Sequence, residues 1–183
     1  MNTAANINTV KVTDLKPMAM RGDCAAQYRL AMHYGTRRRP DYAKAMQWLR
    51  LASLQGHAVA DYNIGFMHEF GLGTAKDYAK AARAYARAGR QGYPNALNNL
   101  GILHAGGLGV ERDMAKAVDY WKQASRLGLG EASYNLAMLQ MDKSGAISDR
   151  QEFFFWVNKA ASQGCEKAMA WMEDNAPLLM SVN

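Results

Sequence analysis

The stretch NIGFMHEFGLGT, residues 63–74, returns 36 positions later (99 − 63) as NLGILHAGGLGV, residues 99–110. Taken alone, the first copy holds a histidine, a glutamate and a Gly-x-Gly, the residue types of a metal ligand beside a phosphate-binding loop. Its return indicates a repeat instead. A period between about 20 and 50 residues is typical of solenoid proteins, and it decides the fold before any local motif does.

The same step of 36 residues marks both ends of one helix in each copy. An aspartate precedes a helical pattern and suits the N-cap, where its carboxylate accepts a hydrogen bond from a free amide. A glycine follows that helix and suits the position after it, where a positive φ is needed. The aspartates are Asp41, Asp77, Asp113 and Asp149, and the glycines are Gly56, Gly92, Gly128 and Gly164.

Each copy therefore predicts a pair of helices. The second helix of each pair follows its aspartate, and the first helix carries the stretch quoted above. The first helices are expected at residues 24–34, 58–70, 95–105 and 131–142, and the second helices at 41–55, 77–91, 113–127 and 149–163.

Two slots of the repeat predict how the helices of a pair pack. A slot of small residues on the first helix lets the two helices approach closely, and a slot in the middle of the second helix holds a large ring in three copies of four. We expect Trp48→Ala to lower stability by about 3–5 kcal/mol, the usual range for large core deletions. The small slot holds Ala31, Gly65, Gly101 and Ala137, and the large slot holds Trp48, Ala84, Tyr120 and Trp156.

The pattern resembles the Sel-one-like repeat family, relatives of the tetratricopeptide repeats. The resemblance implies an all-α fold, a right-handed α/α superhelix or solenoid of about four helix-pair repeats with a C-terminal capping helix. It covers residues 22–175, with an N-terminal arm at 1–21, either disordered or packed in the groove, and a tail at 176–183. The matching motifs are Ala96-x-x-x-Leu100-Gly101, Gly107-Leu108-Gly109-Val110, Asp113-x-x-Lys116-Ala117-x-x-x-Trp121 and Ala124-x-x-x-Gly128.

Composition and charge restrict the partners and the cellular compartment that we expect for the protein. The chain has 183 residues and a net charge of +6, which permits an acidic partner or nucleic acid without requiring either. Its apolar runs are too short for a membrane span, and the N-terminus lacks the pattern of a secretory signal. The two cysteines, Cys24 and Cys165, are far apart in sequence and do not form a disulfide framework. We therefore expect a cytoplasmic protein.

The residues that invite a chemical interpretation fit the repeat better. His68 and His104 share one slot, but no further ligand stands at a fixed spacing, so an amphipathic ring between helices explains them better than a metal site. Glu69 follows His68 without an HExxH motif, and no Gly-Lys-Ser/Thr follows the glycines. We expect no catalytic residues, no metal and no cofactor, and therefore no enzyme.

A groove along the first helices is the first candidate binding surface. By analogy with tetratricopeptide repeats, aromatic and methionine side chains on these helices face the concave side and suit a helix or an extended segment of a partner. The alternative is that several of them pack against neighbouring first helices. The residues are Tyr28, Met32, Tyr62, Phe66, Glu69, Phe70, Asn98, Ile102, Tyr134 and Met138.

A basic face on the second helices is the other candidate surface. It would contact the phosphates of nucleic acid or the carboxylates of an acidic protein. A merely solvated face explains it better, because the lysine slot belongs to the family pattern and no exposed aromatic residues alternate with the cations. The residues are Arg37, Arg38, Arg39, Lys80, Arg83, Arg87, Arg90, Lys116 and Arg126.

Together these features predict a protein–protein interaction scaffold or regulatory adaptor without enzyme activity, which holds a partner segment in the groove. Two alternatives stay open: an immunity protein that neutralises a secreted bacterial toxin, and a protein that binds nucleic acid through the basic face. The expected partner is another protein, with no membrane contact, and the chain is expected to be a monomer or a weak homodimer.

Overall fold

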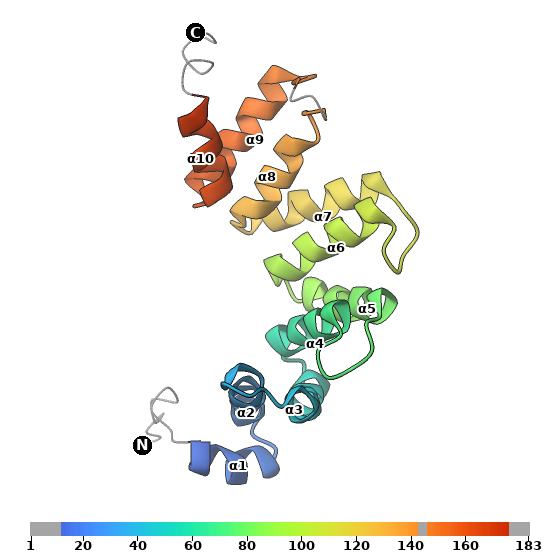
Figure 1. Cartoon of the computed structure of the whole chain (residues 1–183), viewed down its shortest axis with the longest axis vertical. Coiled ribbons are helices and arrows are strands. Elements are labelled where there is room, and N and C mark those ends of the chain that lie inside the picture. Colours follow the sequence, from blue (N-terminus) through green and yellow to red (C-terminus); the bar gives the residue numbers. More distant parts are fainter. Residues whose placement is uncertain (1–11, 143–145, 176–183) are drawn as a thin grey trace. The chain divides into compact units, whose positions relative to one another are not determined.

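The computed structural model describes residues 12–142 and 146–175, and these ranges contain ten α-helices (Figure 1). An isolated bridge between Met141 and Ile147 is the one β interaction within them. The all-α fold predicted from the repeat is confirmed. The helices are α1 (Val12–Met20), α2 (Cys24–Thr36), α3 (Tyr42–Leu54), α4 (Ala58–Phe70), α5 (Tyr78–Arg90), α6 (Pro94–Gly106), α7 (Met114–Arg126), α8 (Gly130–Met138), α9 (Arg150–Ser162) and α10 (Glu166–Asp174).

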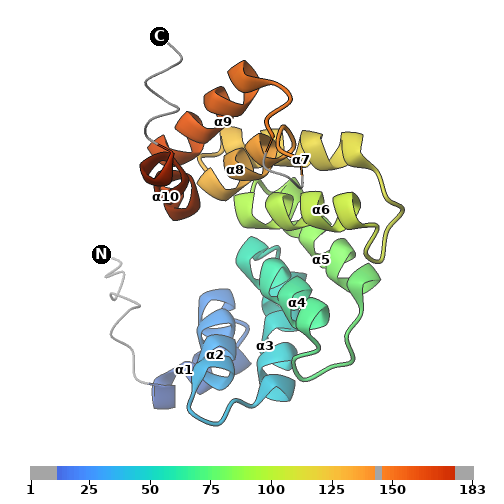
Figure 2. The same ribbon diagram turned by 45° about the horizontal axis from the view of Figure 1, so that its top comes forward.

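The helices form the predicted pairs, and the chain divides into two compact units, Met1–Gln91 and Gly92–Asn183. The first unit holds α1 and the pairs α2–α3 and α4–α5, and the second holds the pairs α6–α7 and α8–α9 followed by α10. The two views in Figures 1 and 2 show the helices of each pair side by side. None of the described helices combines the length and the apolar character needed to cross a membrane.

The helix ends use the predicted aspartates and glycines. Each of the four aspartates is an N-cap, and its carboxylate accepts a hydrogen bond from the amide three residues later, at 3.0 Å for Asp41 and 2.9 Å for the other three. The four glycines follow the second helices with φ between 77° and 90°. Because a side chain at positive φ is strained, glycine stops each second helix at a fixed place.

The N-cap of α7 leads to a prediction about pH. The pKa of Asp113 lies below its ordinary value of 3.8, first because the Lys116 amide donates to the carboxylate and then because the Lys116 ammonium pairs with it. Such a carboxylate stabilises the fold above its unfolded pKa, and the effect is lost as the pH falls through the lower folded pKa. We expect Asp113→Ala to lower the thermal midpoint at about pH 7 but hardly at about pH 2. Circular dichroism melts at both values test this, and an equal loss at both would contradict it.

The helices of a pair pack through matched residue sizes. A Cβ on Gly65 would lie 2.6 Å from the ring of Tyr85, and one on Gly101 would lie 2.6 Å from Cδ1 of Trp121. The close approach predicted at these glycines is thus confirmed. In the first and fourth pairs the first helix has alanine in the small slot, and the second helix has an aliphatic residue at the position of Tyr85 and Trp121. These residues are Ala31 and Leu49 in the first pair and Ala137 and Val157 in the fourth, and all four are buried.

This geometry corrects the position of the large slot. The side chain that meets the small residue of the first helix lies one position after the large slot marked in the sequence. Trp48 and Tyr120 of the marked slot are only half-buried, whereas their neighbours Leu49 and Trp121 are 2% and 5% exposed. In the fourth pair Trp156 of the marked slot is buried, at 9% exposed, like its neighbour Val157. Both slots contain large residues, so residue size alone could not separate them. The slot that faces the small residues contains Leu49, Tyr85, Trp121 and Val157.

Part of the expected N-terminal arm is a helix. Leu15 and Ala19 of α1 are buried in a cluster with Ala26 and Leu30 of α2. Gly22 follows α1 with a φ of 94°, as Gly56 follows α3 with 78°. α1 therefore takes the place of a second helix before the first pair. Residues 1–11 of the arm and the tail 176–183 lie outside the described residues.

The two helices of a pair are joined by linkers whose ends meet at one backbone hydrogen bond. In the first three pairs the amide of the capping aspartate donates to a carbonyl near the end of the first helix, at 2.8–2.9 Å, and in the fourth the Ser148 amide donates to the Gln140 carbonyl at 2.8 Å. The first helix of the fourth pair, α8, is shorter than predicted: it ends at Met138 rather than at residue 142. Beyond α8 the Asp142 carboxylate accepts a hydrogen bond from the Ala146 amide at 3.0 Å. The three acceptors in the first three pairs are Tyr34, His68 and His104.

Candidate partner-binding surface

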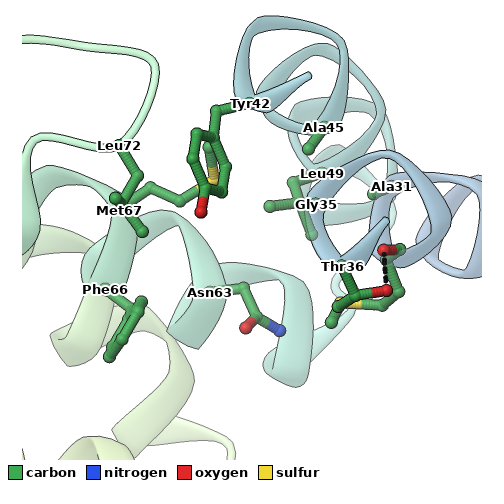
Figure 3. A pocket seen from close by; sticks show the side chains of 11 residues that line it. Ala31, Gly35, Thr36, Tyr42, Ala45, Leu49, Asn63, Phe66, Met67 and Leu72 are labelled. Atoms are coloured by element: carbon green, nitrogen blue, oxygen red, sulfur yellow. Dashed lines mark hydrogen bonds between the residues drawn. The ribbon is translucent and has the colours of Figure 1, made fainter. Parts of the chain in front are cut away.

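The first unit contains an apolar pocket of about 190 Å³ between α2, α3 and α4. Figure 3 shows Tyr42, Met67 and Leu72 on one side of it and Ala31, Gly35 and Leu49 on the other, with Asn63 and Phe66 below. Apolar atoms dominate its walls, so it suits an apolar group. The full lining is Ala31, Met32, Gly35, Thr36, Tyr42, Ala45, Leu49, Asn63, Phe66, Met67 and Leu72.

The pocket follows from the residue sizes of the first pair. Leu49 stands where the next pair has the ring of Tyr85, and Gly35 adds no side chain on the facing helix. The wall is completed by the linker after α4. Gly73 there has a φ of 65°, and a Cβ on it would lie 2.6 Å from Cβ of Tyr42. A small core residue and a tightly packed linker together leave a hollow at the surface.

Exposed aromatic surface continues beyond the pocket. Phe66 is 37% exposed and Phe70 is 56% exposed, and their ring centroids are 4.5 Å apart. Large apolar side chains that are exposed next to each other, beside an apolar hollow, are typical of binding surfaces. Burying one such side chain contributes about 1.5–3 kcal/mol.

The other residues of the predicted groove in this unit have contacts within the fold. Tyr28 stacks on His57 with centroids 4.6 Å apart, and Tyr62 lies 5.6 Å from the ring of Tyr85. Glu69 accepts a hydrogen bond from the Tyr85 hydroxyl at 2.5 Å. The structure therefore brings Met32 and Phe66 together at the pocket, places Phe70 beside Phe66, and gives Tyr28, Tyr62 and Glu69 partners inside the unit.

The predicted groove residues of the second unit are mostly half-buried. Asn98 accepts from the Asn135 amide at 2.9 Å through its side chain and from the Trp121 indole at 3.1 Å through its carbonyl. Tyr134 and Met138 pack against the core of that unit. Ile102 is 42% exposed. Ile102 is therefore the one exposed residue among the predicted groove residues of the second unit.

Several of the predicted basic residues have acidic partners. Lys80 and Lys116 pair with their own capping aspartates, each at 3.1 Å, and Arg37 pairs with Asp41 at 3.5 Å. The predicted residues that are exposed and make no ion pair within residues 12–142 and 146–175 are Arg38, Arg39, Arg83, Arg90 and Arg126.

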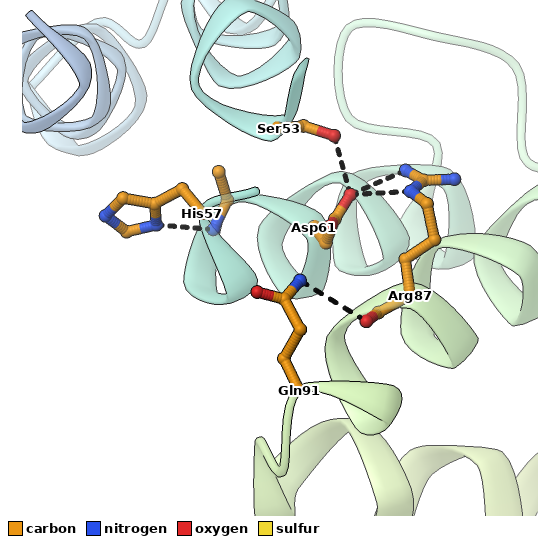
Figure 4. Close-up of polar contacts among 6 residues, drawn as sticks. Ser53, His57, Asp61, Arg87 and Gln91 are labelled. Atoms are coloured by element: carbon orange, nitrogen blue, oxygen red, sulfur yellow. Dashed lines mark hydrogen bonds and ion pairs between the residues drawn. The ribbon is translucent and has the colours of Figure 1, made fainter. Parts of the chain in front are cut away.

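Arg87 pairs with a buried acid. Asp61 is only 2% exposed, and its Oδ1 accepts from Nε and Nη2 of Arg87, each at 2.7 Å, and from the Ser53 hydroxyl at 2.6 Å (Figure 4). Asp61 is not among the residues predicted from the sequence, where its one signal is an acid among the apolar residues that begin α4.

A second cavity, which we call the basic cleft, lies between α3, α4 and α5 and measures about 670 Å³. His68 on its floor is 6% exposed. Burial lowers the pKa of His68, and the charges of Lys80, Arg50 and Arg83 lower it further, against the opposing charge of Asp77. The lining is Arg50, Ser53, Leu54, Ile64, His68, Lys80, Arg83, Ala84 and Arg87.

The two histidines that share a slot have different surroundings. The ring of His104 stacks on Tyr120 at 5.6 Å and its Nδ1 lies 3.3 Å from the Glu111 carbonyl, whereas His68 is buried. Across residues 12–142 and 146–175, no three histidine, cysteine, aspartate or glutamate side chains come together as a set that could hold a metal ion.

Comparison with known proteins identifies the repeat. The family model described as Sel1 repeat matches four times, at residues 24–57, 58–93, 94–129 and 130–165, each match holding one first helix and one second helix. Repeats of this family form scaffolds that generally mediate protein–protein interaction. No curated protein matches the chain.

Solved structures agree with this. A protective antigen of uropathogenic Escherichia coli strains with an SLR fold is 30% identical over 90% of this chain, with a TM-score of 0.79. A Sel1 repeat protein from Oxalobacter formigenes is 30% identical over 86%, with a TM-score of 0.78. The chain covers 36% and 64% of these two proteins. An immunity protein from Pseudomonas aeruginosa is 18% identical over 85% of this chain and is covered over 74% of its own length, with a TM-score of 0.52, and shares the fold.

Four consecutive repeat matches, with boundaries that fall between the observed helix pairs, show that the chain belongs to the Sel1 repeat family.

Proposed function

We propose that the protein is a non-enzymatic scaffold that binds a partner protein by taking one of the partner's apolar side chains into the pocket between α2, α3 and α4. The observation that carries the proposal is the position of Phe66, which lines the pocket and is still 37% exposed. A partner side chain in the pocket would bury Phe66, and the adjacent Phe70 would extend the contact.

The occupant that fits is an apolar residue of a helix or of an extended segment. The pocket has room for a single side chain rather than for a folded domain. A few well-placed anchors supply most of the affinity of a protein interface, and they lie in pockets that exclude water. Asn63 also lines the pocket; its amide nitrogen donates to the Val59 carbonyl at 2.8 Å, and its side-chain oxygen can accept a hydrogen bond from the partner backbone.

The ion pairs of the second helices favour a protein partner over nucleic acid. Lys80 and Lys116 are paired with the capping aspartates, which reduces the charge they offer to phosphates. An immunity function would be the same binding task with a toxin as partner, and the likeness to the Pseudomonas aeruginosa protein supports the fold alone. The free thiols of Cys24 and Cys165 suit the cytoplasm, where the scaffold would act as a monomer or weak homodimer.

The test compares two exposed phenylalanines. We expect Phe66→Asp to weaken partner capture by about tenfold or more, because a carboxylate in the pocket loses its water without gaining a counter-ion. Phe155→Asp is the matched control, since Phe155 is 58% exposed in the second unit. Each variant and the wild type are tagged, used in pull-downs from the native cell, and titrated with the partner found.

Melting curves of both variants are recorded in parallel, so that a folding defect is recognised. Equal capture by the wild type and by folded Phe66→Asp would contradict the pocket as the binding site. Loss of capture with Phe155→Asp alone would move the site to the second unit.

A further inference from the structure

The basic cleft gathers positive charge from two helices over an enclosed floor. Arg50 comes from α3, and Lys80, Arg83 and Arg87 come from α5, while α4 supplies the floor with Ile64 and His68. Both floor residues are 6% exposed. Arg50, Lys80 and Arg83 are exposed, and together with Arg87 they line a concave site.

The charges in the cleft do not balance. Lys80 pairs with Asp77 at 3.1 Å, and Arg87 pairs with Asp61 at 2.7 Å (Figure 4). The side chains of Arg50 and Arg83 make neither an ion pair nor a hydrogen bond with any residue in the ranges the structure describes. Four cations against two carboxylates leave an excess of two positive charges (4 − 2).

His68, which lines the cleft, has a buried polar atom that is unsatisfied. Its Nδ1 is buried and has no hydrogen-bond partner among residues 12–142 and 146–175. A buried polar atom without a partner destabilises the fold, and a ligand that reaches this atom by a small movement of the ring recovers that cost. Because burial and the nearby cations lower its pKa, the ring is neutral at neutral pH and carries one N–H donor.

We propose that the basic cleft binds a phosphate monoester. A phosphate monoester carries a charge of about −1.5 to −2 at neutral pH, which matches the excess of positive charge. The forked guanidinium groups of Arg50 and Arg83 suit phosphate oxygens, to which arginine donates two hydrogen bonds at once. The ester oxygen leads to an organic body, and Leu54 on the cleft is 84% exposed and offers it an apolar surface.

The same phosphate chemistry has two sources. A small phosphorylated molecule would enter the cleft whole, and its volume of about 670 Å³ lies in the range of about 300–1,000 Å³ that small-molecule sites have. A phosphorylated side chain of a partner protein would insert its phosphate in the same way. Phenyl phosphate, which joins a phosphate to an apolar ring, represents the first source, and a short phosphoserine peptide represents the second.

The experiment is a calorimetric titration of the full chain with phenyl phosphate at low ionic strength. The cleft variant is Arg50→Gln with Arg83→Gln. The control variant is Arg38→Gln with Arg39→Gln, which removes the same charge from exposed residues of the linker between α2 and α3. We expect the control to bind like the wild type and the cleft variant to bind about a hundredfold more weakly or not at all, since each of the two lost charge-assisted contacts is worth about tenfold in affinity. NMR should show the His68 ring signals shifting during the titration in the wild type and in the control.

The outcomes separate the alternatives. No binding to the wild type, equal binding by both variants, or equal loss in both overturns the proposal. Of the two sources, tighter binding of phenyl phosphate identifies a small molecule, and tighter binding of the phosphopeptide identifies a modified partner. A peptide with glutamate in place of phosphoserine, or a single-stranded oligonucleotide, that binds as tightly as the monoesters also overturns it. Phe66→Asp should leave phenyl phosphate binding unchanged, so the result does not depend on the proposed scaffold function.

Discussion

Trp121→Ala is expected to lower the free energy of unfolding by about 3–5 kcal/mol, the range for removing a large buried ring. Trp121 is 5% exposed, lies against Gly101 and donates from its indole to the Asn98 carbonyl at 3.1 Å. Its removal leaves a cavity between α6 and α7 and a carbonyl without its donor. Chemical denaturation followed by far-ultraviolet circular dichroism measures the loss.

Trp48→Ala is the comparison that tests which position of the second helix belongs to the core, the slot of Trp48 or the slot of Trp121 one position later in the repeat. Trp48 is half-buried, so part of its ring is already in water, and its removal should cost less than that of Trp121. A larger loss at Trp48 than at Trp121 would show that the slot one residue earlier, as first inferred from the sequence, is the true core position.

Gly101→Ala is expected to destabilise the protein by about 1–3 kcal/mol, although alanine is the better helix former. A Cβ on Gly101 would lie 2.6 Å from Cδ1 of Trp121, closer than van der Waals contact permits, and the ring is held by its own hydrogen bond. Either α6 and α7 must separate or the indole must leave its position. The free energy of unfolding is again the measurement.

Gly35→Ala is the matched control for this substitution. Gly35 also lies on a first helix, but a Cβ there would be 3.8 Å from Cβ of Ala45, an ordinary contact. We expect this change to be neutral or to stabilise by up to about 1 kcal/mol. Combining Gly101→Ala with Trp121→Leu should recover part of the loss caused by the alanine, because the first pair uses alanine and leucine at the same two slots. Equal effects at Gly35 and Gly101 would show that helix propensity, not contact, governs both.

Much of the fold could be predicted because its signals are local. An aspartate cap and a terminal glycine act within one turn of their own helix, and both predictions for Asp113 and Gly128 are confirmed. The close approach at Gly101 was also predicted, since only a residue without a side chain fits there. The ring that faces Gly101 is one residue after the slot marked as large, because Tyr120 and Trp121 are both aromatic and only the rotation of α7 separates them.

The sites depended on contacts that a repeat does not encode. The pocket beside Phe66 exists because Leu49 replaces a ring, a departure from the pattern rather than part of it. The role of Arg87 depends on Asp61, which is 26 residues away on another helix. α1 was missed because the shorter first linker sets Gly22 34 residues before Gly56 (56 − 22), out of step with the period of 36.

The backbone hydrogen bond that closes each linker allows the linker to change in length during evolution. It fixes the residue at which the second helix starts, whatever sequence lies between the donor and the acceptor. The enclosed segment runs from Tyr34 to Asp41 in the first pair and from His68 to Asp77 in the second, yet α3 and α5 both have 13 residues. Residues can therefore be inserted inside such a closed loop while the helix register is kept. New specificity can arise at these loops by lengthening them, at little cost to the core.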